Sequence, residues 1–189
     1  GTVGENAARV ALGMGADVTL LDRGADRLAE LEAVFGARLK GAISTPQRLR
    51  ALLPAQDLVI GAVLLPGARA PRLIMRSDLA CMRPGSVIVD VAIDQGGICE
   101  TSRPTSHTEP LYVEAGVVHY CVTNMPSAVA RTATLALTQA TLPHALQIAT
   151  QGLKNAVARD VHLAAGLQTY AGNVTHAGLA RDLGLPFIA

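Results

Sequence analysis

The feature that most constrains the fold is a series of short, nearly continuous apolar runs separated by segments with helical spacing. Such runs indicate parallel strands buried on both faces, because the connecting helices cover the sheet. With right-handed crossovers, they predict an α/β fold with a doubly wound parallel sheet. Strands are expected at residues 18–21, 37–40, 57–63, 86–91 and 116–122, and helices at 5–16, 25–35, 46–53, 74–82, 131–158 and 175–183.

A glycine pattern opens the first expected helix. Gly1-Thr2-Val3-Gly4 matches the second half of the G-x-G-x-x-G dinucleotide fingerprint, and Asp22 ends the next strand, where an acidic residue is expected. The glycines would let backbone N–H groups approach a pyrophosphate, and Asp22 would accept hydrogen bonds from the adenosine ribose. Its carboxylate would repel a 2′-phosphate, which favours NAD over NADP, whereas Arg27 could accommodate that phosphate. The alternative is that the glycines serve a tight turn and Asp22 caps the next helix.

Further candidates follow the later strands, at the edge where doubly wound sheets bind ligands. Asp90 and Asp94 lie around the end of the strand at 86–91. Asp94, nearer the expected cleft, is the candidate for acid–base or orienting work, and Asp90 is expected to be structural. A loop cap is the alternative for either. Val63 and Leu64 could flank a cofactor ring or belong to the core, and the segment 124–126 could meet the nicotinamide edge.

Composition argues against several other classes. The formal charge of +1 leaves no field that would attract nucleic acid or an acidic membrane surface. The longest apolar run, residues 58–65, is too short to cross a bilayer. The three cysteines lack C-x-x-C spacing, which is typical of reduced thiols in a cytoplasmic protein. The histidines have no zinc-site spacing, so no metal is expected.

The strand signal stops near residue 130. We therefore expect a Rossmann-type, NAD-binding domain over residues 1–130 and a helical segment of another layer or domain over residues 131–189. Because Gly1 lies inside the expected strand-to-helix turn, the sheet is expected to lack its first strand and the chain to be a fragment. The apolar face of 131–158 is then expected to be partly exposed.

Four segments resemble the C-terminal half of bacterial alanine dehydrogenase, and the similarity runs along essentially the whole chain. They are GTVGENAARVALGMGADVTLLD, IGAVLLPGARAPRLI, VIVDVAIDQGGICETSRPT and HYCVTNMPSAVARTATLALT. The resemblance implies an NAD-dependent enzyme that reversibly oxidises L-alanine to pyruvate and ammonium and forms a homo-oligomer, typically a hexamer. The NAD-binding subunit of proton-translocating transhydrogenase is similar too and is the alternative.

The resemblance also implies roles for single residues. Asp94 matches the family's catalytic aspartate, which helps with proton transfers or holds the water that attacks the iminium intermediate. The histidine, arginine and lysine that act on the substrate belong to the family's N-terminal half, so this chain is expected to need that missing domain and to be inactive alone. The resemblance also implies that residues 131–189 are the helical C-terminal part of the substrate-binding, catalytic domain. The implied cofactor contacts are Gly1, Thr2, Val3, Gly4, Asp22, Arg27, Ser44, Val63, Leu64, Val91, Ala92, Ile93, Asp94, Arg103, Val122, Thr123, Asn124 and Met125.

Overall fold

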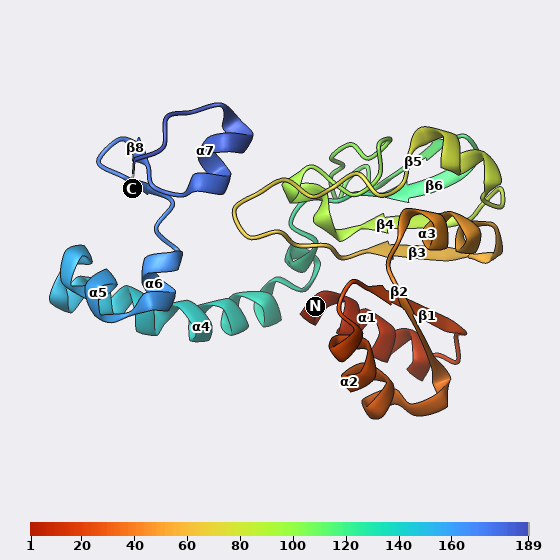
Figure 1. The fold of residues 1–189 in the computed structure, drawn as a ribbon, viewed down its shortest axis with the longest axis horizontal. Coiled ribbons are helices and arrows are strands. Elements are labelled where there is room, and N and C mark those ends of the chain that lie inside the picture. Colours follow the sequence, from red (N-terminus) through yellow and green to blue (C-terminus); the bar gives the residue numbers. More distant parts are fainter. Residues whose placement is uncertain (189) are drawn as a thin grey trace. The chain divides into compact units, whose positions relative to one another are not determined.

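The computed structural model describes residues 1–188 and divides them into two compact units (Figure 1). The first comprises residues 1–64 and 70–123, and the second comprises residues 65–69 and those from 124 onward. The first unit contains the parallel sheet strands, and the second is mainly helical. Each is described by itself below.

The first unit alternates helices and strands over its N-terminal half, as the apolar runs predict. Its helices are α1 (Thr2–Gly13), α2 (Ala25–Phe35) and α3 (Pro46–Leu52). Its strands are β1 (Val18–Asp22), β2 (Leu39–Ile43), β3 (Leu58–Gly61), β4 (Val87–Asp90), β5 (Leu111–Glu114) and β6 (Val117–Tyr120). Short 3-10 helices connect them: η1 (Gly36–Arg38), η2 (Leu53–Ala55), η3 (Arg76–Cys81) and η4 (Val91–Gln95).

The pairing confirms the predicted parallel α/β architecture. β1 pairs with β2, β3 with β4, and β4 with β6, all in parallel, with Gly61 opposite Asp90 and Val89 opposite Tyr120. The order in the larger sheet is β3-β4-β6-β5, and Figure 1 shows β3, β4 and β6 side by side. The carboxyl ends of β3, β4 and β6 therefore lie along one edge.

The strand β5 differs from the sequence prediction, which has no strand between 91 and 116. It pairs antiparallel with β6 through a two-residue turn at Ala115 (φ 50°) and Gly116 (φ 80°). Two successive positive φ values are typical of the tight turns that match the twist of a hairpin. The alternation of exposed and half-buried residues in Leu111–Glu114 is that of an edge strand, which explains why no solid apolar run marks it.

A second difference concerns residues 74–82, for which the spacing predicts a helix. The structure has only the 3-10 helix η3 there. The carboxylate of Asp78 accepts a hydrogen bond from the backbone N–H of Met75 at 2.8 Å, and the fully buried Leu79 packs into the core. This turn buries its apolar residue without needing the length of an α-helix.

An apolar groove lies between α1 and β3. Within the described residues, β1 pairs only with β2 and β3 only with β4, so each has an unpaired edge. The groove has a volume of about 610 Å³ and is lined by Val3, Val10 and Met14 of α1, among others, and by Leu58 and Ile60 of β3. A doubly wound sheet would place a strand there, between β1 and β3.

The second unit begins with the 3-10 helix η5 (Met125–Val129). It continues with α4 (Ala130–Gln151), α5 (Leu153–Arg159), α6 (Val161–Ala165), β7 (Thr169–Tyr170), β8 (Asn173–Val174) and α7 (Ala177–Leu183). Gly152, at φ 75°, separates α4 from α5 and so interrupts the single helix predicted over 131–158. Leu135, Leu137 and Leu146 are exposed on α4, as expected. None of the helices in residues 1–188 is both long and apolar enough to span a membrane.

Candidate dinucleotide-binding site

The start of α1 presents uncapped backbone donors. The helix begins at Thr2 after Gly1, and no side chain within residues 1–188 caps it. The first N–H groups of a helix have no partner inside it, and the helix dipole makes this end electropositive. A Cβ added at Gly4 would lie 3.9 Å from the Cβ of Ala62, so α1 approaches the chain just after β3 closely. The segment Gly1–Gly4 can therefore present N–H groups to an anion.

Asp22, at the carboxyl end of β1, faces this helix start. Its Oδ1 accepts a hydrogen bond of 2.9 Å from the N–H of Gly24, the residue that precedes α2. Its Oδ2 lies 3.9 Å from the backbone nitrogen of Gly1. Ser44, which follows β2, donates its backbone N–H to the carbonyl oxygen of Asp22 at 2.8 Å. One carboxylate oxygen of Asp22 thus binds the loop that leads into α2, and the other lies beside the start of α1.

Arg27 is held by two carboxylates. Its guanidinium lies 2.5 Å from Glu5 of α1 and 2.8 Å from Glu30 of α2. Hydrogen bonds from Arg27 and then Arg9 lower the pKa of Glu5, and those to Glu30 and Glu5 raise the pKa of Arg27. Two acidic partners leave little positive charge for a 2′-phosphate. This arrangement weakens the expectation that Arg27 accommodates NADP.

Asp90 is a fully buried hydrogen-bond centre at the end of β4. Its Oδ1 accepts from the N–H of Ala92 at 3.2 Å. Its Oδ2 accepts from the N–H of Ile98 at 2.7 Å, from the N–H of Cys99 at 3.4 Å and from the hydroxyl of Ser102 at 2.6 Å. One carboxylate thereby fixes η4, the turn after it and the start of the following loop, in agreement with the structural role expected for Asp90.

Asp94 lies on η4, which this centre fixes, and is exposed. No hydrogen bond or ion pair engages its carboxylate in the described part of the chain. Gly96 and Gly97 follow at φ 97° and 80°. A Cβ added at Gly97 would lie 2.6 Å from Oδ2 of Asp90, so this turn needs glycine for space as well as for conformation. The result is a rigidly mounted, accessible carboxylate, which is what general acid–base work requires.

The remaining predicted residues have unequal surroundings. Val63, after β3, packs against the core, whereas Leu64 is 68% exposed. Val91 is half-buried, and Ala92 and Ile93 are buried in η4.

Beyond β6 the predicted contacts divide between the units. Val122 is buried, and the exposed Thr123 donates its N–H to the carbonyl of Thr105 at 3.2 Å. Asn124, at φ 52°, and Met125 belong to the second unit.

Arg103 is exposed and stacks on a tyrosine. Its guanidinium carbon is 4.0 Å from the ring centroid of Tyr112 in β5. Unlike Arg27, it forms no ion pair with a carboxylate of residues 1–188. The ring of Tyr112 stacks in turn on His119 of β6, with centroids 4.9 Å apart. His119 is fully buried and therefore belongs to the core.

Three residues at the site escaped the sequence prediction. Glu5 pairs with Arg27, Ser102 bonds to Asp90, and Tyr112 supports Arg103. A signal existed only for Tyr112, because the alternating residues 111–114 and the mostly apolar residues 117–120 are separated by two residues that include a glycine, a spacing typical of a hairpin. The other two contacts join segments brought together by packing, which no local pattern marks.

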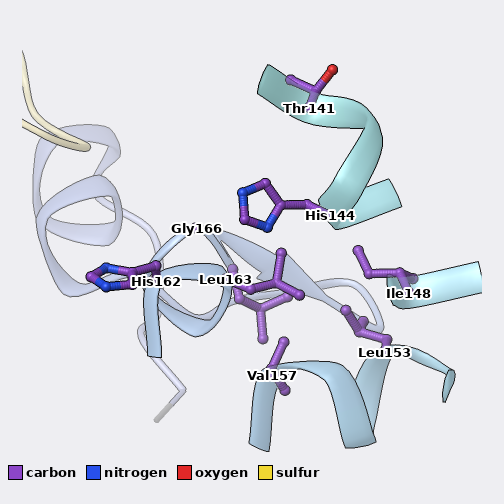
Figure 2. A pocket seen from close by; sticks show the side chains of 9 residues that line it. Thr141, His144, Ile148, Leu153, Val157, His162, Leu163 and Gly166 are labelled. Carbon is purple, nitrogen blue, oxygen red and sulfur yellow. The ribbon is translucent and has the colours of Figure 1, made fainter. Parts of the chain in front are cut away.

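A separate pocket in the second unit carries none of the predicted site residues (Figure 2). It has a volume of about 280 Å³ between α4, α5 and α6, and Ile148, Leu153 and Leu163 line it with His144. Apart from Thr141 and two histidines its lining is apolar, and Oδ2 of Asp160 lies 3.9 Å from Nδ1 of His144. No cluster of three potential metal ligands occurs in residues 1–188.

Parallel strands with their polar residues at the carboxyl ends, and a glycine-flanked helix start beside an acidic residue, define the class of doubly wound α/β domains that bind dinucleotides. Comparison with known families agrees. Residues 1–177 match the family model described as alanine dehydrogenase/PNT, C-terminal domain. The chain belongs to this family.

Among the relatives, alanine dehydrogenases are more similar to this chain than a transhydrogenase is. An alanine dehydrogenase of Halomonas elongata is 55% identical over 188 residues, which is 100% of this chain and 51% of the relative. A solved L-alanine dehydrogenase structure matches with a TM-score of 0.83 at 48% identity, covering 97% of this chain and 51% of its own. A transhydrogenase from Sinorhizobium meliloti matches less well, at 30% identity and a TM-score of 0.62 over 71% of this chain and 38% of its own. The chain spans about half the length of the curated relatives it matches.

Proposed function

We propose that this chain is the cofactor-binding half of an NAD-dependent alanine dehydrogenase, which reversibly converts L-alanine to pyruvate and ammonium. The observation that carries the proposal is Asp94, an exposed carboxylate on a turn that the buried Asp90 holds in place. The 55% identity to an alanine dehydrogenase along the whole chain supports the same reaction, and the weaker match makes transhydrogenase the second choice.

NAD fits the residues at the α1 end of the site. Its nicotinamide ring would supply the acceptor for the hydride of the amino acid. The uncapped N–H groups of residues 1–4 would hold its pyrophosphate, and Oδ2 of Asp22, beside the start of α1, would accept from the adenosine ribose. Within the first unit, Ser44, Val63 and Val91 follow β2, β3 and β4 and would extend the site along the carboxyl ends of the strands, the edge where a doubly wound sheet binds ligands.

Asp94 is the proposed catalytic residue of this chain. Oxidative deamination requires proton transfers to release ammonium, and an exposed carboxylate can accept or donate those protons or orient water. Such a group contributes a rate factor of about 10²–10⁴. Its fixed mounting matters, because misplacement of a catalytic group by a fraction of an ångström is costly.

The complete enzyme would need the other half of the protein, which we propose supplies the substrate pocket. We further propose that it acts as a homo-oligomer, a hexamer by resemblance, in the cytoplasm. The three free cysteines fit a reducing compartment.

The test uses the full-length enzyme with Asp94→Asn and the matched control Asp26→Asn, an exposed aspartate on α2. We expect Asp94→Asn to lower alanine-dependent NAD reduction about 100-fold or more while NADH affinity stays within about twofold. Asp26→Asn should leave both unchanged. An Asp94→Asn enzyme with ordinary turnover, or a wild-type enzyme that binds NADH without oxidising alanine, would refute the proposal.

A further inference from the structure

A single hydroxyl group clamps the segment that carries Arg103. The hydroxyl of Tyr112 donates to the carbonyl oxygen of Thr101 at 2.8 Å and accepts from the backbone N–H of Arg103 at 3.0 Å. These partners lie two residues apart, so the phenol bridges both ends of the segment 101–103. Tyr112, a residue of β5, therefore holds the backbone on which the Arg103 side chain is mounted.

The aromatic ring of Tyr112 fixes the side chain as well. One contact is the Arg103 guanidinium, 4.0 Å from the ring centroid, and the other is the imidazole of His119, stacked at 22°. A guanidinium stacked on a ring keeps its N–H edges available to a ligand. Arg103 also has no carboxylate partner in residues 1–188, in contrast to Arg27. Its charge is therefore available and its direction is restricted.

The support under Tyr112 is itself rigid. Nδ1 of His119 lies 3.0 Å from the carbonyl oxygen of Val117, which can only accept, so Nδ1 donates. Nε2 is hydrogen-bonded to the hydroxyl of Thr101 at 2.8 Å, and Sγ of Cys99 lies 2.9 Å from the same hydroxyl. These buried contacts run from β6 to Thr101. They hold both the imidazole of His119, which stacks on Tyr112, and the residue whose carbonyl accepts from the Tyr112 hydroxyl.

We propose that Tyr112 is a positioning residue for the coenzyme, acting through Arg103. It holds the guanidinium in the direction that meets the bound dinucleotide, so that less side-chain entropy is lost on binding. The inference rests on the proposed function, because it assumes that Arg103 touches the dinucleotide. Tyr112 itself need not touch it.

The experiment is a double-mutant cycle in the full-length enzyme, read out by NADH titration. Arg103→Ala should raise the NADH dissociation constant about tenfold. Tyr112→Phe, which removes both hydrogen bonds of the hydroxyl to this segment but keeps the stacked ring, should raise it about three- to fivefold. The double variant should bind no more weakly than Arg103→Ala alone, because Tyr112 acts through Arg103. The KM for alanine should stay within about twofold of the wild-type value, since Tyr112 and Arg103 act on coenzyme binding.

Tyr120→Phe is the matched control. It removes the same hydroxyl from the neighbouring strand β6, where that hydroxyl makes no hydrogen bond in the described residues, and should leave NADH binding unchanged. If Tyr112→Phe melts below the assay temperature, Arg103→Lys decides instead. It keeps the charge but loses the planar stacking, so it should bind NADH nearly as weakly as Arg103→Ala.

The outcomes separate the two proposals. Wild-type NADH binding by Tyr112→Phe, or by Arg103→Lys where that variant decides, would overturn the positioning role, as would multiplicative losses in the double variant. An Asp22→Ala variant that loses NADH binding while Arg103→Ala does not would overturn it too and leave the proposed function standing. If neither variant affects NADH binding, the proposed coenzyme site itself fails.

Discussion

The hydroxyl of Ser102 donates a hydrogen bond of 2.6 Å to the carboxylate of Asp90, a residue with no exposed surface. This contact ties the end of β4 to the residue before Arg103, across the turn that carries Asp94. The two aspartates of VDVAIDQGG therefore have different tasks. Asp90 builds the turn, and Asp94 is left free of protein partners in the described residues to act on a ligand.

The first prediction separates these two tasks by stability. Asp90→Asn should lower the free energy of unfolding by about 1–3 kcal/mol, because an amide has only one acceptor oxygen. Its NH2 group must then face either the N–H of Ala92 or the N–H groups of Ile98 and Cys99, from which it cannot accept. Asp94→Asn, on an exposed and unpaired carboxylate, should change it by no more than about 0.5 kcal/mol. Urea unfolding of the full-length variants measures both. Equal losses in the two variants would contradict the division.

Much of this arrangement is readable from sequence, for a physical reason. The strands β1, β3, β4 and β6 are nearly continuous apolar runs, the pattern expected of parallel strands with both faces covered, and this pattern is visible in a single sequence. The expected structural role of Asp90 also agrees with its burial. Once a strand is predicted, a residue directly after it can be placed at the end of that strand without further information.

What the sequence could not supply are contacts set by packing. Arg27 meets Glu5 only because α2 and α1 lie together, and nothing in the local spacing of either residue indicates the pair. Ser102 meets Asp90 because Gly96 and Gly97 reverse the chain with positive φ values. The edge strand that carries Tyr112 has the pattern of a half-exposed strand, which is weaker than that of a buried one.

The second prediction concerns that glycine pair. Gly97→Ala should cost about 1–3 kcal/mol more stability than Gly96→Ala. Both glycines have positive φ, so both variants carry backbone strain. Only at Gly97 would the new Cβ also meet atoms, at 2.6 Å from Asp90 and 2.8 Å from Ser102, whereas nothing lies within 4 Å at Gly96. Thermal unfolding of the two variants, compared in one buffer, measures the difference, and similar losses would show that the turn has spare room.

The third prediction is a loss of stability at alkaline pH. Burial raises the pKa of the Cys121 thiol, and burial followed by its hydrogen bond to Cys121 raises the pKa of Tyr112. A raised pKa means that the folded state keeps a proton that the unfolded chain releases. The contribution of Cys121 is therefore complete below the ordinary thiol pKa of about 8.5 and is lost as the pH rises above it. That of Tyr112 is lost only as the pH rises above the ordinary phenol pKa of about 10.

Melting temperatures between pH 7 and pH 11 provide the measurement. We expect a flat region up to about pH 8.5 and a fall beyond it. Cys121→Ala should make the fall shallower, while Cys81→Ala, at an exposed thiol, should leave its slope unchanged. A fall of the same slope in Cys121→Ala would assign the alkaline loss to other groups.

The last prediction concerns coenzyme choice. Asp22 beside the start of α1 disfavours a 2′-phosphate, and Glu5 and Glu30 occupy the guanidinium of Arg27, so NADH should bind more tightly than NADPH. Glu5→Gln removes one acidic partner of Arg27 without shortening the side chain. It should raise NADPH affinity about two- to fivefold, the usual size of an exposed ion-pair effect, and leave NADH affinity nearly unchanged. Glu32→Gln on the same helix as Arg27, but outside its ion pairs, is the control. Parallel titrations with both coenzymes decide the matter: if Glu5→Gln raises the affinity for both equally, Arg27 does not read the 2′-position, and the discrimination must come from Asp22 alone.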